Sequence, residues 1–280
     1  MISFVVFCNV ILYILRIFRF FCFWYYTNDK FLTNEYKEQD HTTTVPLTSR
    51  ILIEPQSIIT WNVHGLSLYL DPIKISRIID TINHYLESDV ICLQECFDEQ
   101  LIREIIKNTK IKYWYHQTGN LKKKYVIGEN SGLLILSKIP ITFISFNSFQ
   151  EKGGIETLSN KGFMLCNIGG LTIVNAHLQS HEFNICCSPI NTIINYQIKQ
   201  IKNNTHDENT IYCGDFNTEF VDKHFDISLN NLKSTVTNEN FVIDYIFTRE
   251  NNIKLDVDVI NLPNNPSDHK PMIATINNKI

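Results

Sequence analysis

Polar residues of the kinds that bind metal ions and phosphate groups follow apolar, strand-like runs at several points of this sequence. The groups are Trp61-Asn62, Gln94-Glu95, Asn175-Ala176-His177, Gly214-Asp215-Phe216-Asn217, Asp244 within residues 241–247, and Ser267-Asp268-His269 before the last apolar run. The ends of adjacent strands converge in space, so we expect these side chains to gather at one edge of the fold. Carboxylates, amides and imidazoles together suit a hard divalent cation and phosphate oxygens. The sequence therefore predicts a metal-dependent site for phosphate chemistry.

Each group also has a plain structural interpretation when it is taken alone. An Asp-Phe-Asn segment after a strand, as at residues 215–217, is typical of a turn whose side chains bond the backbone. Glu95 can cap the helix that follows it. Asp244 lies inside an apolar run, where a charge is costly unless it is paired or bound to a metal. The joint occurrence of carboxylates, asparagines and histidines at successive strand ends favours a site over these separate interpretations.

Short apolar runs alternate with helical patterns across the part of the chain that carries these groups. Strands are predicted at residues 57–63, 89–93, 111–116, 132–136, 141–146, 162–168, 171–176, 210–213, 241–247 and 271–276. Apolar residues at helical spacing predict helices at 72–86, at 100–107 with Asp98 as N-cap, and at 191–202. Clusters of strands with helices between them predict an α/β sandwich of two packed sheets, each covered by helices.

The composition limits the classes of protein to which this chain can belong. With 280 residues, 44% of them hydrophobic, it has enough apolar material for one large domain and an appendage. A formal net charge of −4 gives no overall attraction to long nucleic acids, and Lys122-Lys123-Lys124 is typical of a solvated loop. The eight cysteines form no paired Cys-x-x-Cys units, so neither a zinc site nor a disulfide framework is predicted. Cys92, Cys166 and Cys213 lie in apolar runs and are expected to pack as small hydrophobic residues.

Residues 1–26 form an almost unbroken apolar and aromatic stretch that is long enough to cross the hydrocarbon core of a bilayer. The stretch has no basic start and no small-residue cleavage site, so an uncleaved membrane anchor is favoured over a signal peptide. Arg16 and Arg19 would each cost roughly 2.5–3.5 kcal/mol at mid-bilayer unless they reach the interface. Spanning and interfacial insertion therefore both remain open.

The chain after this stretch divides into two parts. Residues 27–55 are polar, show no sustained periodicity and are predicted to be a tether, and residues 56–280 are predicted to be the catalytic domain. Lys30 and Lys37 follow the apolar stretch, so the positive-inside rule predicts a cytosolic catalytic domain on a membrane-associated protein.

The polar groups, taken in order, resemble the motif series of the endonuclease/exonuclease/phosphatase (deoxyribonuclease I-like) superfamily. The motifs that carry the resemblance are Thr60-Trp61-Asn62, Leu93-Gln94-Glu95, Asn175-Ala176-His177-Leu178, Gly214-Asp215-Phe216-Asn217, Ile243-Asp244-Tyr245 and Ser267-Asp268-His269. They span residues 57–276. The resemblance implies a four-layer α/β sandwich and Mg²⁺-dependent hydrolysis of a phosphodiester or phosphomonoester, with Mn²⁺ as a substitute ion.

The resemblance also implies which residues hold the metal ion. Glu95 resembles the main Mg²⁺ ligand, and Asn62 beside it is expected to hold the metal or a phosphate oxygen. Asp268 resembles an additional carboxylate on the metal side. A Mg²⁺ site of one or two carboxylates and waters agrees with these residue types.

The remaining motif residues are expected to act on the substrate. His269 resembles the general base for the attacking water, and Asp244 resembles the carboxylate that fixes its tautomer. Asp215 and Asn217 resemble the pair that orients the nucleophile and binds the phosphate. His177 is expected to donate to a non-bridging or leaving oxygen in the transition state.

Within the superfamily, residues 131–141, 160–163 and 177–180 look most similar to neutral sphingomyelinases, which cleave sphingomyelin to ceramide and phosphocholine. Asn160-Lys161-Gly162-Phe163 weighs most, although a hairpin turn around Gly162 also explains it. An anchor in residues 1–26 agrees with a membrane phospholipid as substrate, because tethering raises the effective substrate concentration. Residues 249–266 depart from the secreted bacterial enzymes because they lack an aromatic hairpin.

Two other functions are left open by the sequence. The segments at 60–63 and 93–95 also resemble tyrosyl-DNA phosphodiesterases and abasic-site endonucleases, for which Tyr113-Trp114-Tyr115 and residues 122–125 could supply stacking and basic groups. A non-catalytic binding module on the same fold is disfavoured, because every motif residue is present in this chain.

Overall fold

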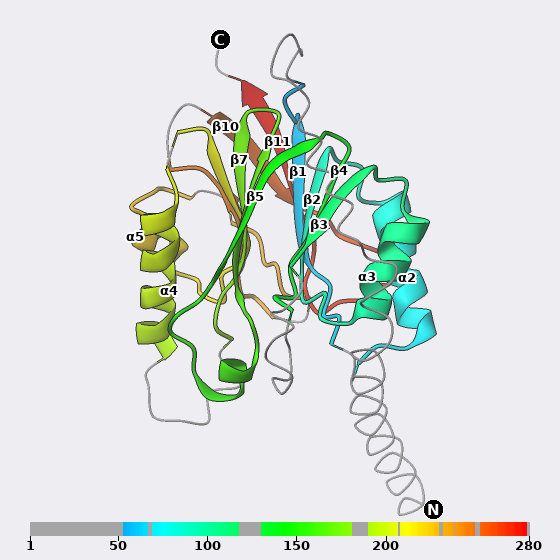
Figure 1. Ribbon diagram of the computed structural model, residues 1–280, viewed down its shortest axis with the longest axis horizontal. Helices are drawn as coiled ribbons and strands as arrows, with labels where there is room; N and C mark the ends of the chain where they lie inside the picture. Colours follow the sequence, from blue (N-terminus) through cyan, green and yellow to red (C-terminus); the bar gives the residue numbers. More distant parts are fainter. Residues whose placement is uncertain are drawn as a thin grey trace, which may run out of the picture.

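The computed structural model of the protein describes residues 53–66, 69–117, 130–180, 190–206, 208–229, 232–237, 239–249 and 253–278 (Figure 1). The predicted anchor at 1–26, residues 27–52 of the predicted tether and the basic run at 122–124 lie outside these ranges. No helix within them is long and apolar enough to cross a membrane.

The first of two sheets, sheet A, has six strands in the order β10-β11-β1-β2-β4-β3. They are β1 (Ser57–Asn62), β2 (Val90–Gln94), β3 (Tyr113–His116), β4 (Leu134–Ser137), β10 (Ile253–Val259) and β11 (Met272–Asn278). β1 and β2 are parallel, and the other neighbouring pairs are antiparallel. Sheet A therefore joins the first described strand to the last one.

The second sheet, sheet B, has five strands in sequence order. They are β5 (Ile141–Ser148), β6 (Gly162–Ile168), β7 (Leu171–His177), β8 (Thr210–Asp215) and β9 (Asp244–Phe247). β7 and β8 are parallel, whereas the other pairs are antiparallel. Each sheet is thus mixed and contains a single parallel pair near its centre.

Helices cover the outer face of each sheet, which gives four layers (Figure 1). α2 (Pro72–His84) and α3 (Glu99–Asn108) lie beside sheet A, and α4 (Ile190–Asn204) and α5 (Val221–Phe225) lie beside sheet B. A short 3₁₀ helix, η1 (Gly154–Leu158), precedes β6. The predicted α/β sandwich is confirmed.

Apolar side chains fill the space between the sheets. Ile58, Met164 and Ile173 are fully buried there, together with Cys92, Cys166 and Cys213. These three thiols are free, and burial raises the pKa values of the Cys92 and Cys166 thiols. They pack as small hydrophobic residues, as predicted.

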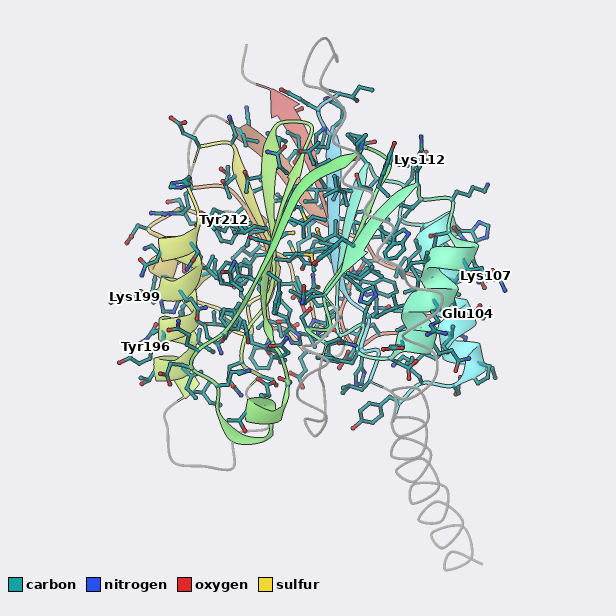
Figure 2. The ribbon with its side chains drawn as sticks, in the orientation of Figure 1. Glu104, Lys107, Lys112, Tyr196, Lys199 and Tyr212 are labelled. Atoms are coloured by element: carbon teal, nitrogen blue, oxygen red, sulfur yellow. The ribbon has the colours of Figure 1, made fainter. Side chains whose placement is uncertain are left out.

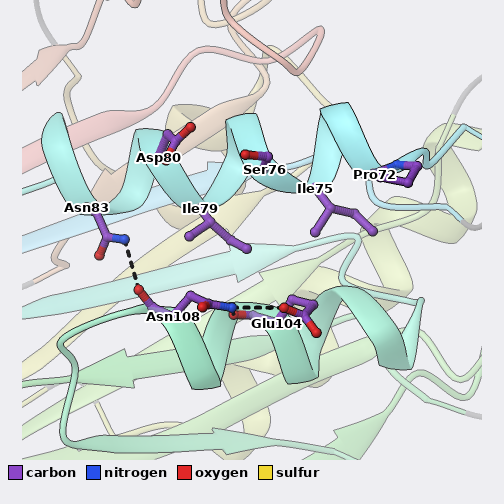
Figure 3. Close-up of a pocket in the computed structure, with 8 residues that line it drawn as sticks. All are labelled: Pro72, Ile75, Ser76, Ile79, Asp80, Asn83, Glu104 and Asn108. Carbon is purple, nitrogen blue, oxygen red and sulfur yellow. Dashed lines mark hydrogen bonds between the residues drawn. The ribbon is translucent and has the colours of Figure 1, made fainter.

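The helices on sheet A begin at aspartate caps. The Asp71 carboxylate accepts a hydrogen bond from the Lys74 amide at 2.7 Å, and the Asp98 carboxylate accepts from Gln100 and Leu101, which confirms Asp98 as an N-cap. α2 and α3 lie side by side and leave a pocket between them in the outer layer, where Asn83 donates to the Asn108 carbonyl (Figure 3).

Side chains on the outer layers divide into solvated and packed ones (Figure 2). Lys107 and Lys199 point away from the helices, whereas the Tyr212 ring lies between sheet B and its helices. The Tyr212 ring is fully buried and stacks on Phe247 with ring centroids 5.1 Å apart. This packing fixes β8 against the helices that cover it.

Two strands of the structure depart from the predicted elements. Residues 253–259 form an edge strand, β10, although no strand was predicted there, and the predicted strand at 241–247 begins only at Asp244. β10 alternates apolar residues with charged ones, and only its two ends are buried. Its pairing with β11 is a tertiary contact that the local pattern does not reveal.

Candidate active site

Six of the predicted site residues lie where strands of both sheets end. Parallel strands bring their carboxyl ends to the same edge, so the β1–β2 and β7–β8 pairs each present two polar residues there. The six residues are Asn62 at the end of β1, Glu95 directly after β2, His177 and Asp215 at the ends of β7 and β8, Asp244 at the start of β9, and His269 before β11. The site is therefore built across the two sheets.

Glu95, His177 and Asp215 form a group that can hold a metal ion, with one ligand atom of each within 4.8 Å of the others. His177 Nε2 lies 3.8 Å from Glu95 Oε1 and 3.6 Å from Asp215 Oδ2. Glu95 Oε2 is buried and has no hydrogen-bond partner among the described residues. A buried carboxylate oxygen without a partner, beside a second carboxylate, fits a divalent cation that prefers oxygen ligands.

The Asn62 side chain connects the two carboxylates of this group. Its amide nitrogen donates to Glu95 Oε1 at 3.0 Å and to Asp215 Oδ2 at 2.9 Å, and its oxygen accepts from the His64 amide. In this arrangement Asn62 offers the carboxylates a donor rather than offering a cation an oxygen. The ligand role of Asn62 stays a prediction, whereas its role in holding Glu95 near Asp215 is visible in the geometry.

His269 and Asp244 form a buried dyad. His269 Nδ1 and Asp244 Oδ2 are 2.8 Å apart, which leaves Nε2 on the side of Asp215, 3.9 Å from Oδ2. Burial lowers the pKa of His269, but the charges of Asp244, Asp215 and Asp268 and the hydrogen bond to Asp244 outweigh it and raise the pKa to about 10. The dyad therefore has the geometry of an imidazole whose Nε2 exchanges a proton with a neighbouring group.

The surroundings of His177 shift its pKa in the direction opposite to that of His269. Burial holds its pKa well below the usual value, and the positive charges of Lys161 and His269 lower it further. His177 Nδ1 is buried without a hydrogen-bond partner among the described residues. The ring is consequently neutral near pH 7 and can act as a neutral hydrogen-bond donor.

Asp215 is shared by the metal-type group and the dyad. Burial, followed by the charge of Asp244, raises its pKa to about 7, although His269, Asn62 and Lys161 oppose this shift. Its Oδ1 accepts from the Asn217 amide at 2.9 Å, and Asn217 in turn donates from its side chain to the Leu178 carbonyl. Asn217 therefore faces the end of β7 and belongs to the wall of the site.

Asp268 lies at the outer edge of the site. Its side chain is 55% exposed, and its carboxylate is 3.4 Å from His64 Nδ1. It belongs to neither of the two carboxylate and histidine groups that the described residues form. The predicted metal-side role of Asp268 stays a prediction.

Three residues of this region were not predicted as part of the site. Lys161 is buried, and its Nζ lies 2.5 Å from Glu156 Oε1 and 3.2 Å from the Leu178 carbonyl. Lys74 Nζ donates to the His64 carbonyl at 2.8 Å, and the negative charges of Asp268 and Glu95 attract its ammonium group. The sequence signal for Lys161 was its place before Gly162, which was used only to choose a substrate; no local pattern pointed to Lys74 or Glu156.

The sequence matches the Endonuclease/Exonuclease/phosphatase family over residues 59–269, a range that contains all six strand-end residues. The chain belongs to this family. The predicted resemblance is thereby confirmed.

Relatives of this family member include phospholipase C from Staphylococcus aureus, which is 26% identical over 200 residues, or 62% of this chain and 61% of the relative. Sphingomyelinase C from Bacillus cereus is 27% identical over 194 residues, which cover 59% of this chain and 57% of the relative. The chain thus spans about three fifths of the length of these relatives.

Solved structures share the fold of this family member at lower identity. Beta toxin from Staphylococcus aureus, in a crystal structure with bound magnesium ions, has a TM-score of 0.65 and 20% identity and covers 79% of this chain and 99% of its own. Humanized TDP2 from D. rerio has a TM-score of 0.57 and 16% identity, with 80% and 99% covered. These similarities support the four-layer fold of the Endonuclease/Exonuclease/phosphatase family.

Proposed function

We propose that this protein is a metal-dependent phosphodiesterase. The observation that carries the proposal is the sharing of Asp215 between a group that can hold a cation and the Asp244–His269 dyad. Glu95 and Asp215 would hold Mg²⁺, or Mn²⁺ in its place, with His177 beside them. A divalent cation there would polarise the phosphoryl group and neutralise its developing charge.

The residues of the chain have separate tasks in this proposal. Asp244 accepts from His269 Nδ1 and so keeps Nε2 free to take a proton from water. The charge and hydrogen bond of Asp244 and the charge of Asp215 raise the pKa of His269, so a cation that balances the charge of Asp215 would lower that pKa. Neutral His177 donates to a phosphate or leaving-group oxygen. Asn62 keeps the two carboxylates together.

We further propose that the diester is a membrane phospholipid, with sphingomyelin cleaved to ceramide and phosphocholine. Support comes from residues 131–141 and 160–163 and from the relatives named sphingomyelinase C and phospholipase C. The net charge of −4 agrees with a substrate other than a long polyanion. Residues 1–26 would place the enzyme at the membrane, with its catalytic domain on the cytosolic side.

A nucleic-acid phosphodiester is the competing substrate. The predicted stacking residues at 113–115 argue against it, because Tyr113 and Tyr115 pack against the core between the sheets and Trp114 packs on the helix side of sheet A. Base stacking requires an aromatic face that is open to the solvent. The described residues of β3 therefore offer no exposed aromatic platform.

The test compares four substrates with the full-length protein in detergent. Sphingomyelin vesicles, phosphatidylcholine vesicles, abasic duplex DNA and 5′-tyrosyl DNA are each assayed with Mg²⁺, with Mn²⁺ and with EDTA. We expect turnover of sphingomyelin that needs the cation and that Glu95→Gln lowers at least about 100-fold, as for groups that act on transition-state charge. Glu104→Gln, an acidic residue on α3 outside the site, is the matched control and should retain activity.

Two outcomes would contradict the proposal at different levels. Equal turnover with EDTA would exclude the metal-dependent mechanism. Turnover of either DNA substrate without turnover of lipid would support the phosphodiesterase activity and contradict the lipid substrate.

A further inference from the structure

A short segment, residues 234–237, touches both parts of the chain that carry the dyad, and its Thr235 is buried. Thr235 is 0% exposed, and its hydroxyl oxygen accepts from the Ile243 amide at 3.1 Å and from the Asp244 amide at 3.3 Å. The Thr235 amide donates to the Phe241 carbonyl at 3.0 Å. This one residue therefore fixes the backbone from which the Asp244 carboxylate projects.

The opposite side of the same segment holds the backbone of His269. The Thr235 carbonyl accepts from the Lys270 amide at 2.6 Å, and Val236 forms an isolated antiparallel bridge with His269. The Thr237 amide donates to the Asp268 carbonyl at 2.7 Å. Residues 234–237 thus form hydrogen bonds with the backbone around Asp244 and with the backbone around His269. These two residues are 25 positions apart in the chain.

The Asp244 backbone also pairs with Asp215 of β8, but its carboxylate has only one hydrogen-bond partner among the described residues. Its Oδ2 faces His269 Nδ1, and its Oδ1 is buried without a hydrogen-bond partner among the described residues. A carboxylate with one side-chain partner keeps its direction only if its backbone is fixed. The amides of Ile243 and Asp244, which donate to the Thr235 hydroxyl, belong to this backbone.

We propose that Thr235 is a positioning residue that sets the Asp244–His269 distance from the backbone side. This proposal rests on the proposed function, in which the dyad takes a proton from water. Thr235 belongs to neither of the two groups of possible metal ligands that the described residues form; its hydroxyl acts through the amide of Asp244. The feature that matters is the oxygen at the γ position, because Thr235→Val keeps the shape of the side chain and removes the acceptor of the Ile243 and Asp244 amides.

The experiment compares Thr235→Val with Thr235→Ser, which keeps the hydroxyl. We expect Thr235→Val to lower kcat by about 10- to 100-fold, the range found for residues that orient functional groups, with KM changed by less than about 2-fold. Thr235→Ser should restore most of kcat. Thr210→Val is the matched control, because Thr210 is equally buried and starts β8 at the end away from Asp215.

A second measurement needs no substrate. The proton between His269 Nδ1 and Asp244 gives a far-downfield resonance in the NMR spectrum of the full chain, which the His269→Gln variant assigns by removing it. We expect Thr235→Val to shift or broaden that resonance, and Thr235→Ser and Thr210→Val to leave it in place. This readout remains valid even if the protein turns over none of the four diesters.

Several results would overturn the positioning role. Thr235→Val with wild-type kcat would do so, and so would an unchanged downfield resonance in that variant. An equal fall of kcat in Thr210→Val would assign the effect to stability alone. If Thr235→Val does not fold, loss of kcat or of the resonance in Thr235→Ser is decisive against the proposal, because the hydroxyl is present there.

Discussion

Asp215 belongs both to the group that can hold a cation and to the group that contains Asp244 and His269. Its protonation state therefore depends on both groups. Its pKa of about 7 results from burial and from the charge of Asp244. Asp215 is therefore largely protonated below pH 7 in the metal-free protein, whereas an exposed aspartate would be ionised there. The ionised form is the one that binds a cation.

We predict from this that cation affinity depends on pH. Because a bound cation must displace the proton from Asp215, the apparent Kd for Mn²⁺ should rise up to about 10-fold per pH unit below pH 7 and level off above it. Titration calorimetry at pH 5.5, 7.0 and 8.5 measures this dependence. Asp215→Asn should bind weakly at every pH, and a wild-type affinity that stays constant from pH 5.5 to 8.5 would contradict the assignment.

A second residue-scale prediction concerns the amide of Asn62. Asn62→Asp would place a third carboxylate against Glu95 and Asp215 in place of a donor to both. Loss of these bonds and added repulsion should cost about 2 kcal/mol or more, which corresponds to roughly 5 °C in melting temperature for a domain of this size. A cation relieves the repulsion, so Mn²⁺ should raise the melting temperature of Asn62→Asp more than that of Asn62→Ala.

The measurement is thermal unfolding of both variants in EDTA and in Mn²⁺. Equal stabilisation of Asn62→Asp and Asn62→Ala by Mn²⁺ would show that position 62 does not face the cation group.

Residue types and spacing were enough to predict which side chains meet, but not how they are paired. Asn62 was expected to hold the metal or a phosphate oxygen, which stays a prediction, and the sequence did not reveal that its amide donates to two carboxylates. Lys161 and Glu156 form a buried ion pair whose partners lie in a loop and a 3₁₀ helix, where periodicity carries no information. Such pairings depend on side-chain packing between distant segments, which a single sequence does not encode locally.

Among the elements, the strands and helices with strong apolar periodicity were predicted within a few residues. α2 was expected at 72–86 and spans Pro72–His84, and β8 was expected at 210–213 and extends to Asp215. β10 was missed because an edge strand with three charged residues looks like a solvated loop. α5 was missed because five residues are too few to show a helical period.

The β7–β8 pair gives an element-scale prediction at Gly214. Its φ is +136°, and a Cβ at this position would lie 2.0 Å from the Ala176 carbonyl oxygen. Gly214→Ala should therefore push apart the strands that carry His177 and Asp215, which should abolish both activity and cation binding and lower the melting temperature sharply.

Gly170→Ala is the matched control for this substitution. Its φ is also positive, at +91°, but no atom lies within 4 Å of the added Cβ. It should cost only about 1–2 kcal/mol of backbone strain and keep the site. Circular dichroism melts and calorimetric cation titration compare the two variants; a Gly214→Ala protein that binds Mn²⁺ normally would show that the pair tolerates separation.

At the scale of the whole molecule, residues 1–26 are predicted to raise the rate at which the enzyme meets its membrane substrate. They are predicted to leave the rate of the chemical step unchanged. No residue in them resembles a catalytic motif, so a protein starting at residue 27 should keep its turnover of a soluble chromogenic choline-phosphate ester. Its turnover of sphingomyelin vesicles should fall by about 10-fold or more, because the tether raises effective concentration.

Fractionation and alkaline carbonate extraction of the full-length protein complete this test. The anchor predicts that the protein stays with the membrane pellet. A soluble full-length protein, or an equal loss on both substrates after deletion, would mean that residues 1–26 belong to the fold or to a cleaved leader.

The pairing of β1 with β11 has a consequence for biosynthesis. Ser57 lies opposite Thr275, so β1 can pair with β2 early but cannot pair with β11 until residue 275 has left the ribosome. His269 arrives in that same last portion, directly before β11. Non-local pairings of this kind form slowly, and unpaired strands expose apolar surface in the meantime. A nascent chain therefore completes the Asp244–His269 pair only shortly before sheet A can close, and under the proposed function hydrolytic activity should appear only after β11 has been synthesised.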